Sequence, residues 1–163
     1  SFDTAPGVMA LVTMPLSHGL NTDIPFVLAL DGINDPGNMG TIIRLADWFG
    51  LSQIVASSDS VDAFNPKCLA ATMGSFLRVE VVYTDLYLVA QDRTVYGAYL
   101  EGESVHGLTP SVKSMLLIGS ESHGIRESAE KLVTHPITIP GKGKAESLNA
   151  GMATAILLDN LLR

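Results

Sequence analysis

The sequence predicts a single α/β domain in which a parallel sheet carries helices on both faces. Short apolar runs of strand length alternate with segments of helical periodicity along all 163 residues. The run Phe26–Leu30 is almost continuously apolar, as is typical of a strand buried on both faces. Hydrophobic residues make up 47% of the chain, enough to form a sizeable core in one domain, 1–163.

The first predicted strand is followed by a polar loop and a helix. Asp-Gly, Asn-Asp and Pro-Gly pairs end the strand Phe26–Leu30, and apolar residues then recur at helical spacing over 42–49. The pattern predicts a helix that starts near residue 39, with Asn38 as its N-cap, and stops at Gly50. Asn38 and Arg44 are then expected near the helix start, where free amides favour a polar or anionic ligand. Taken alone, this segment equally allows a plain cap and a solvated arginine.

Two later segments repeat this arrangement. Ser114–Gly124 is an apolar run ending in a glycine turn, and 125–133 follows with helical period. Pro136–Ile139 predicts another strand, Pro140–Glu146 a glycine and lysine loop, and Ser147–Leu162 a helix with its first residue as N-cap. Because ligands of open α/β sheets bind outside the carboxyl ends of the strands, all three loops are expected to line one crevice.

The remaining segments complete the expected alternation of strands and helices. Strands are expected at Val8–Met14, Gln53–Ala56, Leu77–Val82 and Val95–Leu100, and helices at Pro66–Met73 and Asp85–Gln91.

Three runs together resemble a known family. They are NDPGNMGTIIRLADWFG, LLIGSESHGI and ITIPGKGKAESLNAGMATAIL, and their order and spacing are similar to the successive motifs of the SpoU (TrmH) family of RNA ribose 2′-O-methyltransferases, in the SPOUT superfamily. With the strands that precede them, they cover most of the chain from about Phe26. Two positions depart from the family pattern. Gly141 stands where an apolar residue is usual, and AGMATA replaces a valine-rich run.

The resemblance implies S-adenosyl-L-methionine as cofactor and a SPOUT-like fold whose C-terminal part forms a deep trefoil knot. It also implies a methyl donor held largely by backbone groups in the knotted loops. The residues that match the family's motif positions fall into two sets. The polar set expected at the reaction centre is Asn38, Arg44, Glu121, Ser147 and Asn149, and the set expected to bind the cofactor is Gly119, Ile139 and Leu148. For Glu121, Ser147 and Asn149, structural roles in a loop or a helix cap remain the alternative.

For the reaction, positioning is expected to supply most of the rate, because the sulfonium donor carries its own leaving group. A guanidinium is a poor proton acceptor, since its pKa lies above about 12. We therefore expect Arg44 to hold the phosphate beside the target nucleotide and to stabilise the developing alkoxide.

The expected partners follow from the resemblance as well. The substrate is expected to be rRNA or tRNA, and the chain is expected to form a homodimer, for which the small residues of 150–157 offer close packing. A net charge of −7 disfavours a freestanding nucleic-acid binder. Lys142 and Lys144, with Arg44 and Arg126, are the candidates for a local basic rim. An N-terminal RNA-binding domain outside this chain is the other explanation.

Composition argues against several other classes. The single cysteine, Cys68, allows no intrachain disulfide, and the four histidines show no metal-ligand spacing, so no metal is expected. No apolar run is long enough to span a bilayer, and a cytoplasmic location is expected.

Two rival functions are the alternatives to this interpretation. GSESHG resembles a hydrolase nucleophile elbow around Ser122, but Ser120 stands where glycine is needed, and only His135 follows. A non-catalytic RNA-binding or assembly protein that kept the fold is the more serious rival.

Overall fold

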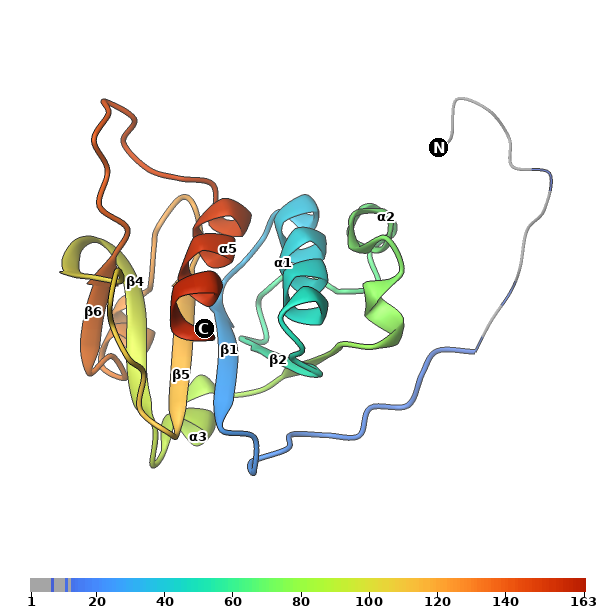
Figure 1. The fold of residues 1–163 in the computed structure, drawn as a ribbon. Helices are drawn as coiled ribbons and strands as arrows, with labels where there is room; N and C mark the ends of the chain where they lie inside the picture. Colours follow the sequence, from blue (N-terminus) through green and yellow to red (C-terminus); the bar gives the residue numbers. More distant parts are fainter. Residues whose placement is uncertain (1–6, 8–10, 12) are drawn as a thin grey trace.

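The computed structural model describes residues 7, 11 and 13–163, which contain a six-stranded parallel sheet with the order β3-β2-β1-β5-β4-β6 (Figure 1). All strand pairings in the sheet are parallel. The strands are β1 Phe26–Asp31, β2 Gln53–Ala56, β3 Glu80–Tyr83, β4 Thr94–Ser104, β5 Ser114–Gly119 and β6 His135–Thr138. The helices are α1 Pro36–Trp48, α2 Pro66–Thr72, the 3-10 turn η1 Ser75–Leu77, α3 Leu86–Ala90, α4 Glu127–Glu130 and α5 Ala150–Leu161.

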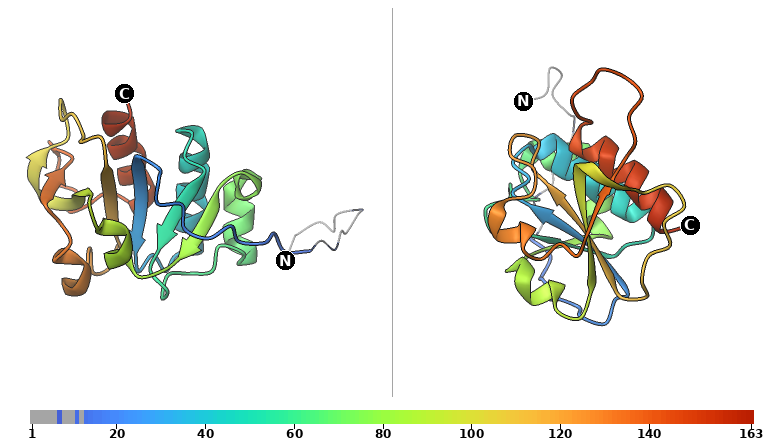
Figure 2. Two further views of the ribbon diagram at one scale, coloured as in Figure 1. Left: turned by 90° about the horizontal axis from the view of Figure 1, so that it is seen from below. Right: turned by 90° about the vertical axis from the view of Figure 1, so that its left-hand side faces the viewer.

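Helices cover both faces of the sheet, which confirms the predicted class. Successive side chains of β1 point to opposite faces, because a strand has a period of two. Leu28 and Leu30 pack in one apolar cluster with residues of α1 and α5, whereas Val27 and Ala29 pack in a second cluster with residues of α3 and α4. Figure 2 shows α1 and α5 together on one side of the sheet, and α3 and α4 on the other.

Helix α1 begins three residues earlier than expected, and its N-cap is not Asn38. Asp35 caps the helix, since its Oδ1 accepts the Asn38 backbone N–H at 2.8 Å, and Pro36 takes the first helical position. Proline is well suited to that position because its missing N–H would have no intrahelical partner there. Because Asp35 caps the helix, the Asn38 side chain is available for contacts outside it.

Helix α5 also has a different start. Asn149, not Ser147, is its N-cap, and the Asn149 Oδ1 accepts the backbone N–H groups of Gly151 at 2.9 Å and Met152 at 3.3 Å. The predicted helix over 125–133 is reduced to the single turn of α4. These differences shift element ends but preserve the predicted order of strands and helices.

The strand predictions differ most toward the edges of the sheet. The expected strand Leu77–Val82 is divided between η1 and β3, and β4 continues four residues beyond the predicted end. Within the stretch Val8–Met14, residues 11, 13 and 14 are not in a strand, and the other positions lie outside the described residues.

The sheet order brings the site loops together. Strands β1 and β5 are parallel neighbours, and Asp31 is in register with Gly119 at their carboxyl ends. The segment 139–149 leaves the edge strand β6, projects beyond the same end of the sheet and enters α5, which lies beside α1 (Figure 1). The three loops that were predicted to line one crevice therefore all leave the same end of the sheet.

Candidate active site

Three polar side chains from the three predicted loops form one hydrogen-bonded group, the polar triad Asn38, Glu121 and Asn149. Glu121 Oε1 accepts Asn38 Nδ2 at 2.7 Å and Asn149 Nδ2 at 2.8 Å. Asn149 Nδ2 also donates to Asn38 Oδ1 at 2.8 Å, and the Ala150 backbone N–H donates to Glu121 Oε1 at 3.3 Å. Segments 83 and 111 residues from Asn38 in sequence are therefore joined at one carboxylate oxygen.

Each triad residue is positioned by its own element. Asn38 lies in the first turn of α1, where the Asp35 cap accepts its backbone N–H, and it is 7% exposed. Glu121 lies in the turn after β5, and Asn149 is the N-cap of α5. A charge-assisted acceptor that satisfies two amide donors is a strong arrangement in a partly buried site. The triad therefore connects the three loops by side-chain hydrogen bonds.

Arg44 is an exposed residue on the middle of α1, not near its beginning as expected. Eight residues separate it from Pro36, about 12 Å at the helical rise. The positive end of the helix dipole acts only on the first turn, so it does not account for a ligand at Arg44. The guanidinium has no ion pair with any residue in the described part of the chain. It is therefore available to an anionic partner.

A cleft of about 510 Å³ lies beside the loop 139–148. Its walls include the predicted cofactor residues Ile139 and Leu148 together with Ser147, and its floor includes the buried Ile137 and Leu157. The rest of the lining is Ala98, Tyr99, Leu100, Thr138, Pro140, Gly141, Gly143, Ala145 and Glu146. The prediction that all three loops line one crevice is therefore wrong for this cleft, because no residue of 31–38 or 119–126 lines it. Small-molecule sites usually have such volumes and apolar walls with a few polar groups.

Gly119, the third predicted cofactor residue, does not line this cleft. A side chain there is excluded, since a Cβ atom would lie 2.1 Å from the carbonyl carbon of Gly124 and 2.2 Å from the nitrogen of Ile125. Ser120 and Gly124 exchange backbone hydrogen bonds of 3.1 and 2.8 Å, which closes a tight turn directly over Gly119. The glycine is required for the backbone approach that places Glu121.

The predicted basic rim is only partly present. Lys142 and Lys144 are exposed on the loop 139–148, and Arg44 is exposed on α1. Arg126 does not contribute to the rim, because its guanidinium is bonded to the carboxylates of Asp31 and Asp59. Those two carboxylates offset its charge.

Sequence reasoning missed the role of Asp35. Its carboxylate caps α1 and also lies 3.3 Å from Lys67 Nζ on α2. The pKa of Asp35 is lowered, first by the hydrogen bond from the Asn38 backbone and then by Lys67. The signal was the Asp-Pro pair, which is a helix-start pattern in its own right.

The geometry gives no support to a hydrolase triad. Ser122 Oγ is 2.8 Å from Nδ1 of its neighbour His123, and both are exposed. His135, the residue that a nucleophile elbow would need, lies on β6 with its ring 5.4 Å from the ring of Tyr96. It bonds Thr134 at 3.0 Å and no serine in the described residues.

The described residues contain neither a candidate metal site nor a candidate membrane-spanning helix. No cluster of three or more His, Cys, Asp or Glu side chains is suitably placed for a metal ion within that part of the chain. None of the described helices has the length and apolarity needed to cross a membrane.

Comparison with known proteins gives consistent matches. Residues 25–159 match the profile of the SpoU rRNA Methylase family. The chain is 36% identical over 141 residues to the 23S rRNA (guanosine(2553)-2'-O)-methyltransferase RlmP of Bacillus subtilis (strain 168), an alignment that covers 83% of this chain and 57% of RlmP.

Two solved structures have the same fold. A TrmH-family protein from Porphyromonas gingivalis has a TM-score of 0.77 and 37% identity, covering 88% of this chain and 61% of that one. An AdoMet-bound rRNA methyltransferase from Sinorhizobium meliloti has a TM-score of 0.76 and 33% identity, covering 83% and 54%. The present chain thus spans less than two thirds of the length of these proteins.

Proposed function

Because the chain belongs to the SpoU rRNA Methylase family, we propose that it transfers a methyl group from S-adenosyl-L-methionine to a ribose 2′-hydroxyl of a structured RNA. The single observation that carries this proposal is the polar triad, which joins all three motif loops at the carboxyl end of the sheet. Ribosomal RNA is the first candidate substrate, because RlmP is named for its action on 23S rRNA. A transfer RNA is the second. A ribosomal substrate favours a cytoplasmic location.

The cleft beside the loop 139–148 fits the cofactor. Ile139 and Leu148 supply apolar walls for a purine, and the glycine and proline backbone supplies amide and carbonyl groups. Gly119 contributes by shaping the neighbouring turn. When bound, the sulfonium cofactor supplies the methyl group together with a neutral leaving group. Ser147 lines the same cleft and is proposed to hydrogen-bond there.

Arg44 and the triad have different proposed tasks. Asn38, Glu121 and Asn149 hold the three loops at fixed separations, so that the ribose and the methyl donor meet in line. Arg44, exposed and without an ion pair in the described residues, binds the phosphate next to the target nucleotide. Its guanidinium also stabilises the developing alkoxide, and the proton leaves to phosphate or water.

A homodimer is proposed from the surface of α1 and α5. Trp48 on α1 is 83% exposed and Met152 on α5 is 59% exposed, and large apolar side chains at such exposure are typical of interaction surfaces. Sedimentation at micromolar concentration should give twice the chain mass. A strictly monomeric mass would contradict this part of the proposal.

A C-terminal trefoil knot is proposed as the finer feature of the fold. It is supported by the path from the edge strand β6 back to α5, which lies beside α1 across the sheet. The segment after β4 also closes against β6, with Val105 N–H donating to Thr138 O at 3.0 Å. Knots are rare in proteins, so a direct test is needed. A chain stretched from its two ends should be shorter than its full contour length if a knot tightens.

Methyl transfer can be tested with tritiated S-adenosyl-L-methionine and unmodified 23S rRNA. The product expected is a 2′-O-methylated nucleotide whose 3′ phosphodiester resists alkali. Arg44→Ala should lower kcat by about 10²–10³-fold, the usual effect of removing one charge-stabilising donor. Arg44→Lys should not restore it, since an ammonium lacks the planar fork.

Lys113→Ala is the matched control for charge. Lys113 is exposed and precedes β5, at the end of the sheet opposite the site. The Lys113→Ala substitution removes one positive charge without changing the triad or the cleft. Its kcat should stay within about twofold of wild type. Turnover of Arg44→Lys near wild type at saturating RNA would contradict the proposed role of Arg44. RNA binding without methyl transfer by the wild-type chain would support the non-catalytic alternative.

A further inference from the structure

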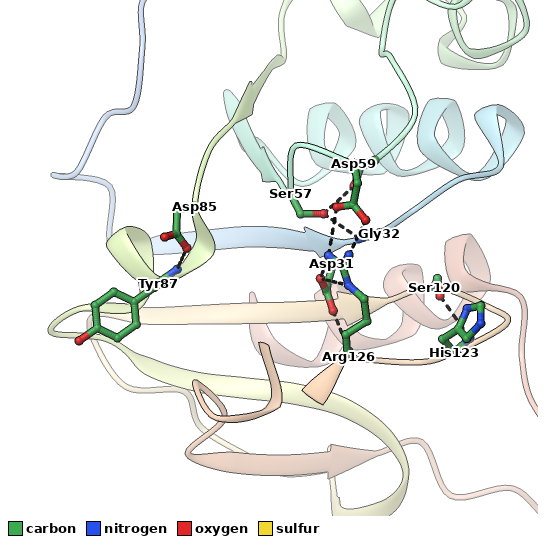
Figure 3. A network of polar contacts seen from close by, with 10 residues as sticks. Asp31, Gly32, Ser57, Asp59, Asp85, Tyr87, Ser120, His123 and Arg126 are labelled. Atoms are coloured by element: carbon green, nitrogen blue, oxygen red, sulfur yellow. Dashed lines mark hydrogen bonds and ion pairs between the residues drawn. The ribbon is translucent and has the colours of Figure 1, made fainter. Parts of the chain in front are cut away.

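Arg126 is bonded to two carboxylates at the carboxyl end of the sheet, outside the polar triad (Figure 3). Its Nε donates to Asp31 Oδ1 at 2.9 Å, and its backbone N–H donates to Asp31 Oδ2 at 2.8 Å. Nη2 also bonds Asp31, while Nη1 and Nη2 both bond Asp59, the latter at 3.1 Å. One guanidinium therefore uses three nitrogens on two carboxylates.

The buried carboxylate of Asp31 requires a positively charged partner. Asp31 is the last residue of β1 and is 1% exposed, whereas the side chains of Arg126 and Asp59 are 39% and 51% exposed. A buried carboxylate is costly unless it is paired and hydrogen-bonded. Arg126 is its ion-pair partner among the described residues, so Asp31 holds Arg126 in one place. The pKa of Asp59 is lowered by hydrogen bonds from Ser57 and Arg126.

Three segments meet at this cluster. Asp31 ends β1, Asp59 lies in the loop after β2, and Arg126 ends the turn after β5. The β1 and β2 segments are joined further by Gly32 N–H, which donates to Ser57 Oγ at 2.9 Å. Gly32 has a φ of +68°, which any other residue would adopt with strain. The Asp31–Arg126–Asp59 cluster thus fixes where the turn begins relative to β1.

The same turn carries Glu121. The Ser120–Gly124 backbone bonds close it into a tight unit, so a displacement at Arg126 is transmitted to Glu121 five residues earlier. Asn38, which donates to Glu121, lies seven residues after Asp31 in the segment that leaves β1. The Arg126–Asp31 ion pair and the Asn38–Glu121 hydrogen bond are therefore two attachments between the same two segments. The triad contains one carboxylate and two neutral amides, whereas the Arg126 attachment pairs a cation with the buried carboxylate of Asp31.

We propose that Arg126 is a positioning residue, which holds the 119–126 turn against β1 so that the Glu121 carboxylate meets Asn38 and Asn149. Asp59 orients the guanidinium from the outer side. The kinetic consequence rests on the proposed methyl transfer. The structural consequence does not, because the amide donors of the triad are present in the protein without any ligand.

The test compares Arg126→Gln with Arg78→Gln. Arg78 also forms a bidentate pair, with Nη2 at 2.6 Å from Asp47, but it links η1 to α1 away from the site. In the wild-type protein, NMR should show slowly exchanging side-chain amide protons of Asn38 and Asn149. Arg126→Gln should speed their exchange by about tenfold or more and lower kcat by about tenfold, with KM for S-adenosyl-L-methionine within about threefold.

Arg78→Gln should change neither quantity by more than about twofold, and Arg126→Lys should recover part of both. Exchange in folded Arg126→Gln within about twofold of wild type would overturn the proposal, as would an equal effect of Arg78→Gln.

If Arg126→Gln does not fold, Asp59→Asn is the decisive variant, because it leaves the buried Asp31 paired. It should speed amide exchange by about threefold, and unchanged exchange would overturn the proposal. If the wild-type chain methylates no RNA, the proposed function fails while the amide exchange still decides the role of Arg126.

Discussion

The loops that surround the candidate site are held in two different ways. The closed half, residues 31–38 with 119–126, contains the polar triad contacts of Asn38 and Glu121 and the ion pairs of Arg126. The open loop, residues 139–148, is exposed from Pro140 onward and forms no hydrogen bond with the described residues before Asn149. The closed half is therefore held by side-chain contacts in the absence of a ligand, whereas we expect the open loop to become ordered when a ligand occupies the adjacent cleft.

A glycine-to-alanine substitution in the closed half and one in the open loop should differ most in their effect on the free energy of unfolding. Gly119→Ala would place a Cβ 2.1–2.3 Å from backbone atoms of Gly124 and Ile125, which cannot move without opening the turn. The expected loss is about 3 kcal/mol in the free energy of unfolding, the upper range for overpacking. Gly143→Ala meets no atom within 4 Å, so its effect should stay within about 0.5 kcal/mol. Urea denaturation of both variants measures the contrast, and equal losses would remove it.

The open loop should matter for binding more than for stability. Leu148 lines the cleft and is 48% exposed, so Leu148→Asp should leave the urea midpoint close to wild type. It should weaken S-adenosylhomocysteine binding by about tenfold or more, because a carboxylate replaces an apolar wall. Leu16→Asp, an exposed leucine outside this cleft, is the control. Equal affinity of the Leu148→Asp and wild-type chains would show that the ligand lies elsewhere.

Hydrogen exchange should sharpen the comparison at backbone level. Saturating S-adenosylhomocysteine should slow amide exchange in residues 139–148 by about tenfold, because the free loop has no internal hydrogen bonds to protect it. Exchange in residues 26–33 should change by less than about twofold, since those residues are already buried. Mass spectrometry of peptides from both segments gives the two values together. Equal protection in the two halves would mean that the closed half is not preformed.

Acid should affect the closed half, with a smaller effect. Hydrogen bonds from the Asn38 backbone and from Ser57 lower the pKa values of Asp35 and Asp59 respectively, so each carboxylate stabilises the fold above the unfolded pKa of about 3.9. That stability is lost as the pH falls from about 4 through the lowered folded values. Asp35→Asn keeps the side-chain oxygen that caps α1 but removes the titrating carboxylate. The free energy of unfolding of this variant should therefore fall less steeply below about pH 4. Glu146→Gln on the open loop should not, and the reverse ranking in pH-dependent urea curves would contradict this account.

The sequence predicted what depends on local pattern. Strand β1 and the turn after β5 were readable because apolar runs end abruptly at polar and glycine residues, and the parallel alternation placed both loops at one edge. The first helix start was misplaced because Asn38 is an equally good cap by type. Asp35 is preferred because Pro36 can follow it at the first helical position. The choice between the two candidate caps therefore depended on the proline that follows Asp35.

The ion-pair network was not readable from the sequence. Arg126 was expected to be one of several basic rim residues, but its partner Asp31 lies 95 residues away, and only the register of β1 with β5 brings them together. The same problem applies to Asn149, which donates to Asn38 at a separation of 111 residues. Asn149 and not Ser147 also caps α5. Long-range polar contacts depend on tertiary register, which a single sequence does not contain.

Calorimetric titration of this chain with S-adenosylhomocysteine tests the central claim most directly. It requires neither the RNA substrate nor any other part of a longer protein. The account predicts saturable binding at one site per chain, because the cleft beside the loop 139–148 has suitable volume and walls. Absence of binding to a chain that is folded by circular dichroism would contradict a cofactor site here, and it would favour the non-catalytic RNA-binding alternative.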